Sequence, residues 1–149
     1  MTVTAHRKLA LTRPLHQIRV SEAMHPGVLT CALETPLRDV ARIMATYRVH
    51  SVVVFGTDDE AVGGRIWGVV SDLDLVSAAA TGGGLEEQTA GATAVTPAVM
   101  VAPSDTLEHA AQLMREHEVA HVVVVDETTA RPVGVLSTLD LARELALGA

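Results

Sequence analysis

The chain has 149 residues, the size of one compact domain with room for two small repeats. Its formal net charge of -7 argues against a nucleic-acid binder, because such proteins gain affinity from Lys and Arg side chains that neutralise phosphates. Cys31 is the only cysteine, so one chain can form neither an internal disulfide nor a cysteine-based zinc site, and we expect a cytoplasmic protein.

The first segment, 1–16, shows no regular apolar period, and we expect it to be a mobile arm. Its apolar run 9–11 is too short for a signal peptide, and no later segment is long enough to span a membrane, so we expect no membrane partner. A short helix is predicted over 17–24, ended by the turn residues 25–27, and a short strand over 28–32.

A longer helix comes next, with Thr35 placed to cap it and Pro36 placed at its first position, where the missing N–H does no harm. Apolar residues from Leu37 to Ala45 recur at helical spacing and predict one buried face. The following pattern predicts a valine-rich strand, a hairpin loop, a second strand and a second helix, over 49–55, 56–64, 66–70 and 71–78.

The same order then recurs, because Leu107, Ala110, Ala111 and Met114 stand seventy positions after Leu37, Val40, Ala41 and Met44. The predicted fold is therefore α/β (α+β), with two strand-helix-strand-strand-helix repeats related by a pseudo-twofold axis and with their sheets facing each other. We divide the chain into the arm, a first repeat, a glycine-containing linker and a second repeat, over 1–16, 17–80, 81–92 and 93–146.

Each repeat ends in the same pattern, Gly-h-h-Ser-x-x-Asp, where h is an apolar residue: Gly68 to Asp74, and Gly134 to Asp140. The pattern is typical of a strand that turns into a helix, and Ser-x-x-Asp is a capping box in its plainest interpretation. The same helix start also offers free N–H groups to a phosphate, and the aspartate could accept from the two hydroxyls of a ribose. Both interpretations remain open at this point.

This arrangement resembles the tandem CBS (cystathionine β-synthase) domain pair, often called a Bateman module, over about Val20 to Leu145. In that family, the cleft between the copies often binds adenosyl ligands such as AMP, ADP, ATP or S-adenosylmethionine. The resemblance implies that the serines meet phosphate and the aspartates meet ribose, and that a threonine and a basic residue of the first repeat belong to the same site. The implied ligand-binding residues are Thr30, His50, Ser71, Asp74, Ser137 and Asp140.

The second repeat departs from the first at two of these places and at one neighbouring basic position. Met100 stands where Thr30 does, Ala120 where His50 does, and Glu118 where Arg48 does. Since a negative side chain repels a phosphate tail, we expect two unequal sites, of which the one holding more residues of the first repeat binds better. The alternative for His50 is a half-exposed histidine at a strand start.

Neither catalysis nor metal binding is predicted. No nucleophile and base stand at an informative spacing, and there is no P-loop and no G-x-G-x-x-G. His117 and His121 have the spacing of a helical metal pair, but the pattern changes from helix to strand at about Val119. We therefore expect no enzyme, no metal site and no required cofactor.

The resulting hypothesis is a regulatory module that binds an adenine-containing small molecule and signals to a partner protein that the sequence does not identify. The alternative is a structural or protein-interaction module of the same fold that binds no ligand. The helices after Pro36, Ser71, Asp105 and Ser137 carry more apolar positions than one small pair of sheets should cover, so we also expect a homodimer.

Overall fold

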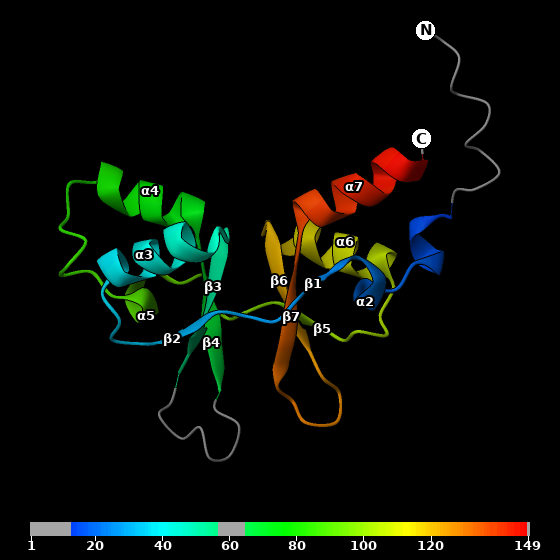
Figure 1. Ribbon diagram of the computed structural model, residues 1–149, viewed down its shortest axis with the longest axis horizontal. Helices are drawn as coiled ribbons and strands as arrows, with labels where there is room; N and C mark the ends of the chain where they lie inside the picture. Colours follow the sequence, from blue (N-terminus) through cyan, green and yellow to red (C-terminus); the bar gives the residue numbers. More distant parts are fainter. Residues whose placement is uncertain (1–12, 57–64, 149) are drawn as a thin grey trace, which may run out of the picture. The chain divides into compact units, whose positions relative to one another are not determined.

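The computed structural model describes residues 13–56 and 65–148, which form two compact units. One unit is Val28–Val99, and the other joins the described part of Met1–Gly27 to that of Met100–Ala149. Most of the predicted arm and of the hairpin loop, residues 1–12 and 57–64, lie outside the described residues. The second unit is therefore built from two separate stretches of the chain (Figure 1).

The Val28–Val99 unit contains a sheet in the order β2-β3-β4 and helices on one of its faces (Figure 1). Strand β2 runs parallel to β3, and β3 runs antiparallel to β4. The elements are β2 (Thr30–Ala32), α3 (Leu37–Tyr47), β3 (Ser51–Phe55), β4 (Ile66–Ser71), α4 (Asp72–Ala80) and α5 (Ala90–Thr93).

The other unit repeats this plan with a sheet in the order β1-β7-β6-β5. Strands β5 and β6 are parallel, and β7 is antiparallel to both β6 and β1. Its elements are the 3-10 helix η2 (Leu15–Gln17), α2 (Val20–Ala23), β1 (His25–Pro26), β5 (Met100–Val101), α6 (Leu107–His117), β6 (His121–Val125), β7 (Pro132–Ser137) and α7 (Thr138–Gly148).

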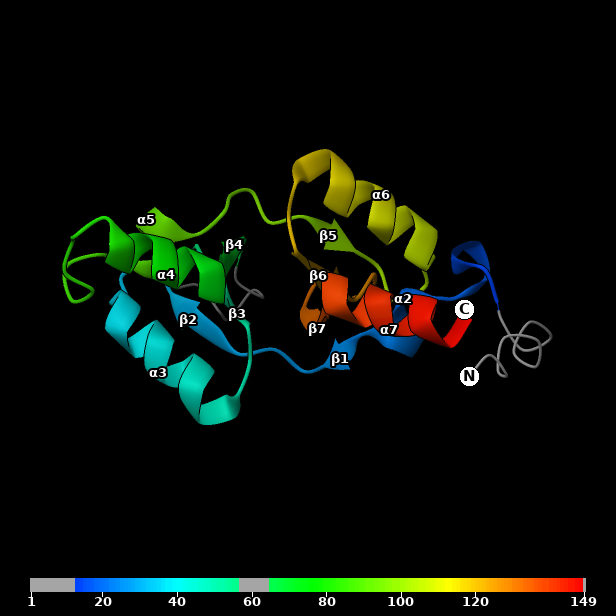
Figure 2. The same ribbon diagram turned by 90° about the horizontal axis from the view of Figure 1, so that it is seen from above.

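Each unit is completed by the segment that precedes the other repeat in the sequence. In one unit, the N–H of Val20 donates to the carbonyl of Asp105 (2.8 Å), so α2 is joined to the start of α6. In the other, the N–H of Ala90 donates to the carbonyl of Thr35 (2.8 Å), which joins α5 to the start of α3. Figure 2 shows α2 beside α7, and α5 contacts β4 and β2. The two repeats thus exchange their first segments.

The cores confirm the helical period read from the sequence. Leu37, Val40 and Met44 of α3 are buried against the valines of β3, and Leu107, Ala110 and Met114 of α6 are the matching residues of the second unit. Because aromatic residues make up only 2% of the chain, these cores are filled almost entirely by aliphatic side chains and methionine.

Two predicted details of the helix starts were wrong. The helix predicted over 17–24 is divided between η2 and α2, because Ile18 has an extended backbone. Thr35 does not cap α3; its hydroxyl accepts from the N–H of Ala32 (3.2 Å), and Pro36 is the N-cap without a side-chain hydrogen bond. The Thr35 hydroxyl thus pairs with a backbone N–H of the turn before the helix and not with one of the helix.

The mixed α/β fold with two sheets is confirmed. The order strand, helix, strand, strand, helix is present in both halves. Within the described residues, no helix has the length and apolar character needed to cross a bilayer.

Candidate functional site

The first Ser-x-x-Asp pattern forms a capping box at the start of α4. Ser71 ends β4 with an extended backbone, and its hydroxyl oxygen accepts from the N–H of Asp74 (3.2 Å). In return, Asp74 Oδ2 accepts from the N–H of Ser71 (2.8 Å). Both residues are half-buried. The capping interpretation of the motif is therefore correct at this helix start.

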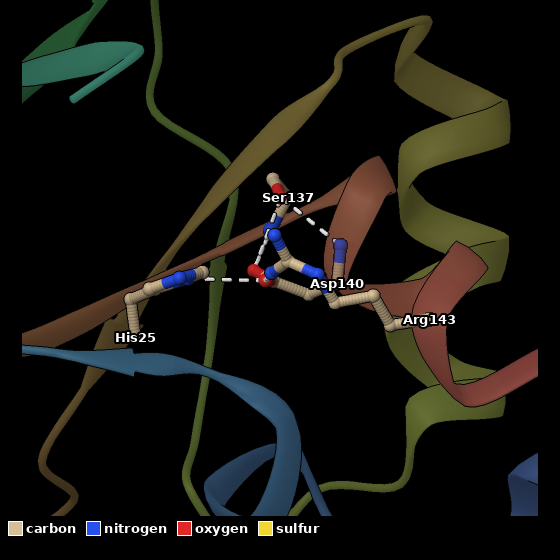
Figure 3. A network of polar contacts seen from close by, with 4 residues as sticks. All are labelled: His25, Ser137, Asp140 and Arg143. Atoms are coloured by element: carbon tan, nitrogen blue, oxygen red, sulfur yellow. Dashed lines mark hydrogen bonds and ion pairs between the residues drawn. The ribbon is translucent and has the colours of Figure 1, made fainter. Parts of the chain in front are cut away.

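The second pattern makes the same two hydrogen bonds at the start of α7. Asp140 Oδ2 accepts from the N–H of Ser137 (2.8 Å), and the Ser137 hydroxyl oxygen accepts from the N–H of Asp140 (3.2 Å). Here the carboxylate has further partners: the Ser137 hydroxyl lies 3.0 Å from Oδ2, while His25 Nδ1 and Arg143 Nη1 lie 3.0 Å and 3.2 Å from Oδ1. Figure 3 shows these side chains converging on one carboxylate.

The two aspartates therefore differ in accessibility. Only 2% of Asp140 is exposed, whereas Asp74 is half-buried. Among the described residues, Asp74 Oδ1 has no hydrogen-bond or ion-pair partner, while both oxygens of Asp140 are engaged. A carboxylate with one open oxygen can still accept from a ligand hydroxyl.

His50 lies next to the start of α4, where its Nδ1 is 2.8 Å from Asp72 Oδ2. The backbone helps to fix this position, since the carbonyl of His50 accepts from the N–H of Asp72 (3.0 Å). Both side chains are mostly exposed. The structure thus brings His50 to the same helix start as Ser71, through a side-chain hydrogen bond that the sequence did not suggest.

Thr30 is exposed and lies apart from that helix start. It pairs with Val53 on β3, whereas Ser71 pairs with Ser51 on the opposite side of β3. Two strand spacings, about 10 Å, therefore separate Thr30 from the strand that carries Ser71. Met100 occupies the matching place in the second unit, pairs with Val123 and is 46% exposed.

Two residues of the Asp140 cluster were missed by sequence reasoning. Arg143 follows Asp140 by three positions on a helix, a spacing at which opposite charges meet, so a local signal existed. His25 gave no signal, because it reaches Asp140 only through the antiparallel pairing of β1 with β7, in which His25 faces Val135.

Other chemistry finds little support in the described residues. Burial raises the pKa of the Cys31 thiol, so the nucleophilic thiolate is disfavoured there. In the part of the chain that the structure describes, no group of three or more His, Cys, Asp or Glu side chains is placed to hold a metal ion.

The family model described as "CBS domain" matches the chain twice, at residues 20–81 and 92–147. A comparison with curated proteins found no significant match. Among solved structures, the CBS domain protein PAE2072 from Pyrobaculum aerophilum, complexed with AMP, is 34% identical to this chain. That alignment covers 87% of this chain and 95% of the other, with a TM-score of 0.74.

Two further structures extend the comparison. Hypoxic Response Protein I, solved with two coordinated zinc ions, is 26% identical, with 84% and 97% of the two chains covered and a TM-score of 0.66. The CBS domain pair of protein MJ0100, in complex with 5-methylthioadenosine and S-adenosyl-L-methionine, is 18% identical, covers 89% and 98%, and has a TM-score of 0.74. With two matched copies over most of its length, the chain belongs to the CBS domain family as a CBS domain pair.

Proposed function

We propose that the chain is a regulatory module, and not an enzyme, that binds an adenosyl ligand and passes the bound state to a partner protein. The observation that carries this proposal is the half-buried Asp74 carboxylate, which has an open oxygen beside a capped helix start. The AMP complex of the 34% identical CBS domain protein supports the same ligand class. AMP, ADP, ATP and S-adenosylmethionine all share the ribose that Asp74 would recognise.

The helix start supplies the complementary chemistry. Asp74 Oδ1 would accept from the ribose hydroxyls, while Oδ2 keeps its hydrogen bond from the Ser71 N–H. The positive dipole end of α4 favours a phosphate, and the Ser71 hydroxyl hydrogen can turn toward it. The N–H groups of Asp72, Leu73 and Asp74 already have acceptors, so a phosphate that binds them directly would displace those acceptors. His50 already donates to Asp72, which reduces the repulsion that this second acid exerts on an anion.

A thermal-shift panel of AMP, ADP, ATP, S-adenosylmethionine and NAD tests the ligand class. A ligand at one hundred times its dissociation constant stabilises the native protein by about 2.7 kcal/mol, which raises the melting temperature by several degrees. Zinc ions are included in the panel as a separate sample because the structure of a 26% identical protein contains two coordinated zinc ions. Stabilisation by zinc alone would contradict the proposal.

The variant Asp74→Asn tests the residue. The amide oxygen still accepts from the Ser71 N–H, so the cap is kept, but the variant loses the charged acceptor for two ribose hydroxyls. We expect at least a tenfold loss of affinity for AMP in titration calorimetry. Asp39→Asn is the matched control, since it removes the same charge from the first turn of α3 in the same unit. Equal affinity in wild type and Asp74→Asn would exclude the ribose role.

The alternative function is a structural or interaction module without a ligand. The completed capping box favours it, because Ser71 and Asp74 satisfy each other when no ligand is present. In that case, Ser71→Ala lowers stability by about 1 kcal/mol, as loss of a cap does, and no compound of the panel shifts the melting temperature.

We also propose a homodimer formed through exposed apolar helix faces. Leu73 and Val76 of α4 are 68% and 63% exposed, and Leu139 and Leu145 of α7 are 52% and 57% exposed. Leu73→Glu with Leu139→Glu should convert the dimer to a monomer in light scattering at tens of micromolar. Arg131→Glu, on the exposed hairpin turn, should leave the mass unchanged. A monomer mass for the wild type would refute the dimer.

A further inference from the structure

The two Ser-x-x-Asp helix starts are alike in their backbone hydrogen bonds and unlike in what surrounds the aspartate. The Ser N–H lies 2.8 Å from Asp Oδ2 in both copies, and the Asp N–H lies 3.2 Å from the Ser hydroxyl oxygen in both. Inside the motif the copies differ only in the Ser137 hydroxyl, which also donates to Asp140 Oδ2 (3.0 Å), and the remaining partners of Asp140 come from outside the motif.

Two positions account for this difference. Arg143 follows Ser137 by six positions, and Ser77 follows Ser71 by six, so Ser77 stands where Arg143 does. His25 faces Val135 across the β1–β7 pair, whereas Val95 faces Val69 in the matching bridge of the other unit. The first copy thus has a short hydroxyl and an aliphatic side chain where the second has two nitrogen donors.

The position of His25 is set by a close backbone crossing. The backbone of β1 lies directly against Gly134 of β7, and a Cβ on Gly134 would lie 2.6 Å from the carbonyl oxygen of His25. Only glycine admits this approach, and the approach brings the His25 ring to within 3.0 Å of Asp140 Oδ1.

The acceptor capacity of the Asp140 carboxylate is consumed by these contacts. An ionised carboxylate offers about four lone-pair sites. In Asp140 they meet the N–H and hydroxyl of Ser137, the His25 ring and the Arg143 guanidinium. With 2% of the residue exposed, a ribose would have to displace His25 or Arg143 before it could donate to either oxygen. Asp74 imposes no such displacement.

We infer that Asp140 is a structural carboxylate, that His25 and Arg143 are the positioning residues that close it to ribose, and that adenosyl binding is confined to the Asp74 copy. This inference rests on the proposed function for its ligand, but the closure of Asp140 is a property of the protein alone. Of the two copies of the motif, the one with Asp74 would thus recognise the ligand and the one with Asp140 would stabilise the fold.

Exchange of the surrounding residues tests the inference. In calorimetry with AMP, the wild type should show a single event, lost in Asp74→Asn and retained within twofold in Asp140→Asn. The double variant His25→Val with Arg143→Ser, which installs the residues of the first copy, should gain a second event. The matched control His16→Val with Arg115→Ser replaces an exposed histidine and an exposed arginine of the same unit and should gain none.

The reverse exchange keeps the test decisive if opening Asp140 unfolds the protein. Val95→His with Ser77→Arg gives Asp74 the partners of Asp140 and should abolish the wild-type event. Two equal events in the wild type, a folded His25→Val/Arg143→Ser variant without a second event, or unchanged binding in Val95→His/Ser77→Arg would each overturn the inference.

A measurement without ligand separates this inference from the proposed function. Since Asp140 is buried and Asp74 is only half-buried, Asp140→Asn should lower the melting temperature by about 10 °C and Asp74→Asn by only a few degrees. If neither the wild type nor any variant binds AMP, the proposed ligand is wrong. The larger loss of melting temperature in Asp140→Asn would still support the inference that the Asp140 carboxylate is closed to ligands. Equal melting temperatures for the two variants would refute it.

Discussion

The two units of this protein use one local motif in two different environments. Ser71 with Asp74 and Ser137 with Asp140 make matching capping boxes, yet Asp74 keeps an open oxygen and Asp140 does not. The capping geometry depends on residues three positions apart, whereas the availability of the carboxylate depends on His25, which reaches it through sheet pairing. A short motif therefore specifies how the helix begins and leaves open whether its acid can serve a ligand.

In both units a backbone carbonyl lies close to the glycine that begins the motif, Gly68 or Gly134. Substitution of these glycines has the largest expected effects and tests whether the two units are equally tight there. In Gly68→Ala the new Cβ would overlap the carbonyl oxygen of Val95, and in Gly134→Ala it would meet that of His25. Because backbone cannot move away cheaply, we expect each variant to lose about 3 kcal/mol in urea denaturation.

Gly82→Ala is the control for these glycines. Gly82 has a φ of +86° and no atom within 4 Å of an added Cβ, so only the strained backbone contributes, about 1 kcal/mol. Losses at Gly68 and Gly134 no larger than at Gly82 would mean that neither crossing is tight. A large loss at only one of them would break the likeness of the two units.

The serines of the two motifs should differ in the next largest effect. The Ser71 hydroxyl only accepts from the N–H of Asp74, whereas the Ser137 hydroxyl also donates to the buried carboxylate of Asp140. Ser71→Ala should cost about 1 kcal/mol, as a lost cap does, and Ser137→Ala about 2 kcal/mol, because a buried charge loses a donor. Thermal or urea unfolding measures both, and equal costs would argue against the extra bond.

The starts of α3 and α6 offer a third contrast. Thr106 caps α6 by accepting from the N–H of His109 (3.1 Å), while the matching Pro36 has no side-chain cap to offer. We expect Thr106→Ala to cost about 1 kcal/mol. Pro36→Thr should not cost stability, since it supplies the cap that α3 lacks. A neutral Thr106→Ala would show that packing alone fixes the start of α6.

The sequence was informative wherever the determinant is local or repeated. The helical period of Leu37, Val40 and Met44, together with its recurrence seventy positions later, is enough to identify the two repeats from the amino-acid pattern alone. The Ser-x-x-Asp pattern likewise predicted both helix starts, because its partners lie three positions apart. Period and spacing are properties of one segment, and the fold class followed from them.

Long-range arrangement was less accessible to sequence reasoning. Nothing in the pattern around His25 indicates that β1 pairs with β7, since a two-residue strand has no period of its own. The role of Thr35 was missed for a related reason: its hydroxyl accepts from the N–H of Ala32 in the preceding turn and not from the helix. The partner of a residue such as His25, which depends on the pairing of distant segments, can therefore be identified only from the structure.

The smallest expected effect concerns the residues that end α3 and α6. Arg48 and Glu118 follow these helices with φ values of 57° and 54°, in the left-handed conformation that side chains disfavour and glycine adopts freely. Arg48→Gly and Glu118→Gly should each raise the free energy of unfolding by up to about 0.5 kcal/mol, because relief of strain exceeds the added freedom of the unfolded chain. A glycine at Ala45, an exposed residue inside α3, should instead lower it by about 1 kcal/mol. Equal gains in the free energy of unfolding at the two positions would show that Arg48 and Glu118 have the same backbone geometry despite their opposite charges. Any difference between their effects on a phosphate ligand must then come from the charge of the side chain and not from the conformation of the helix end.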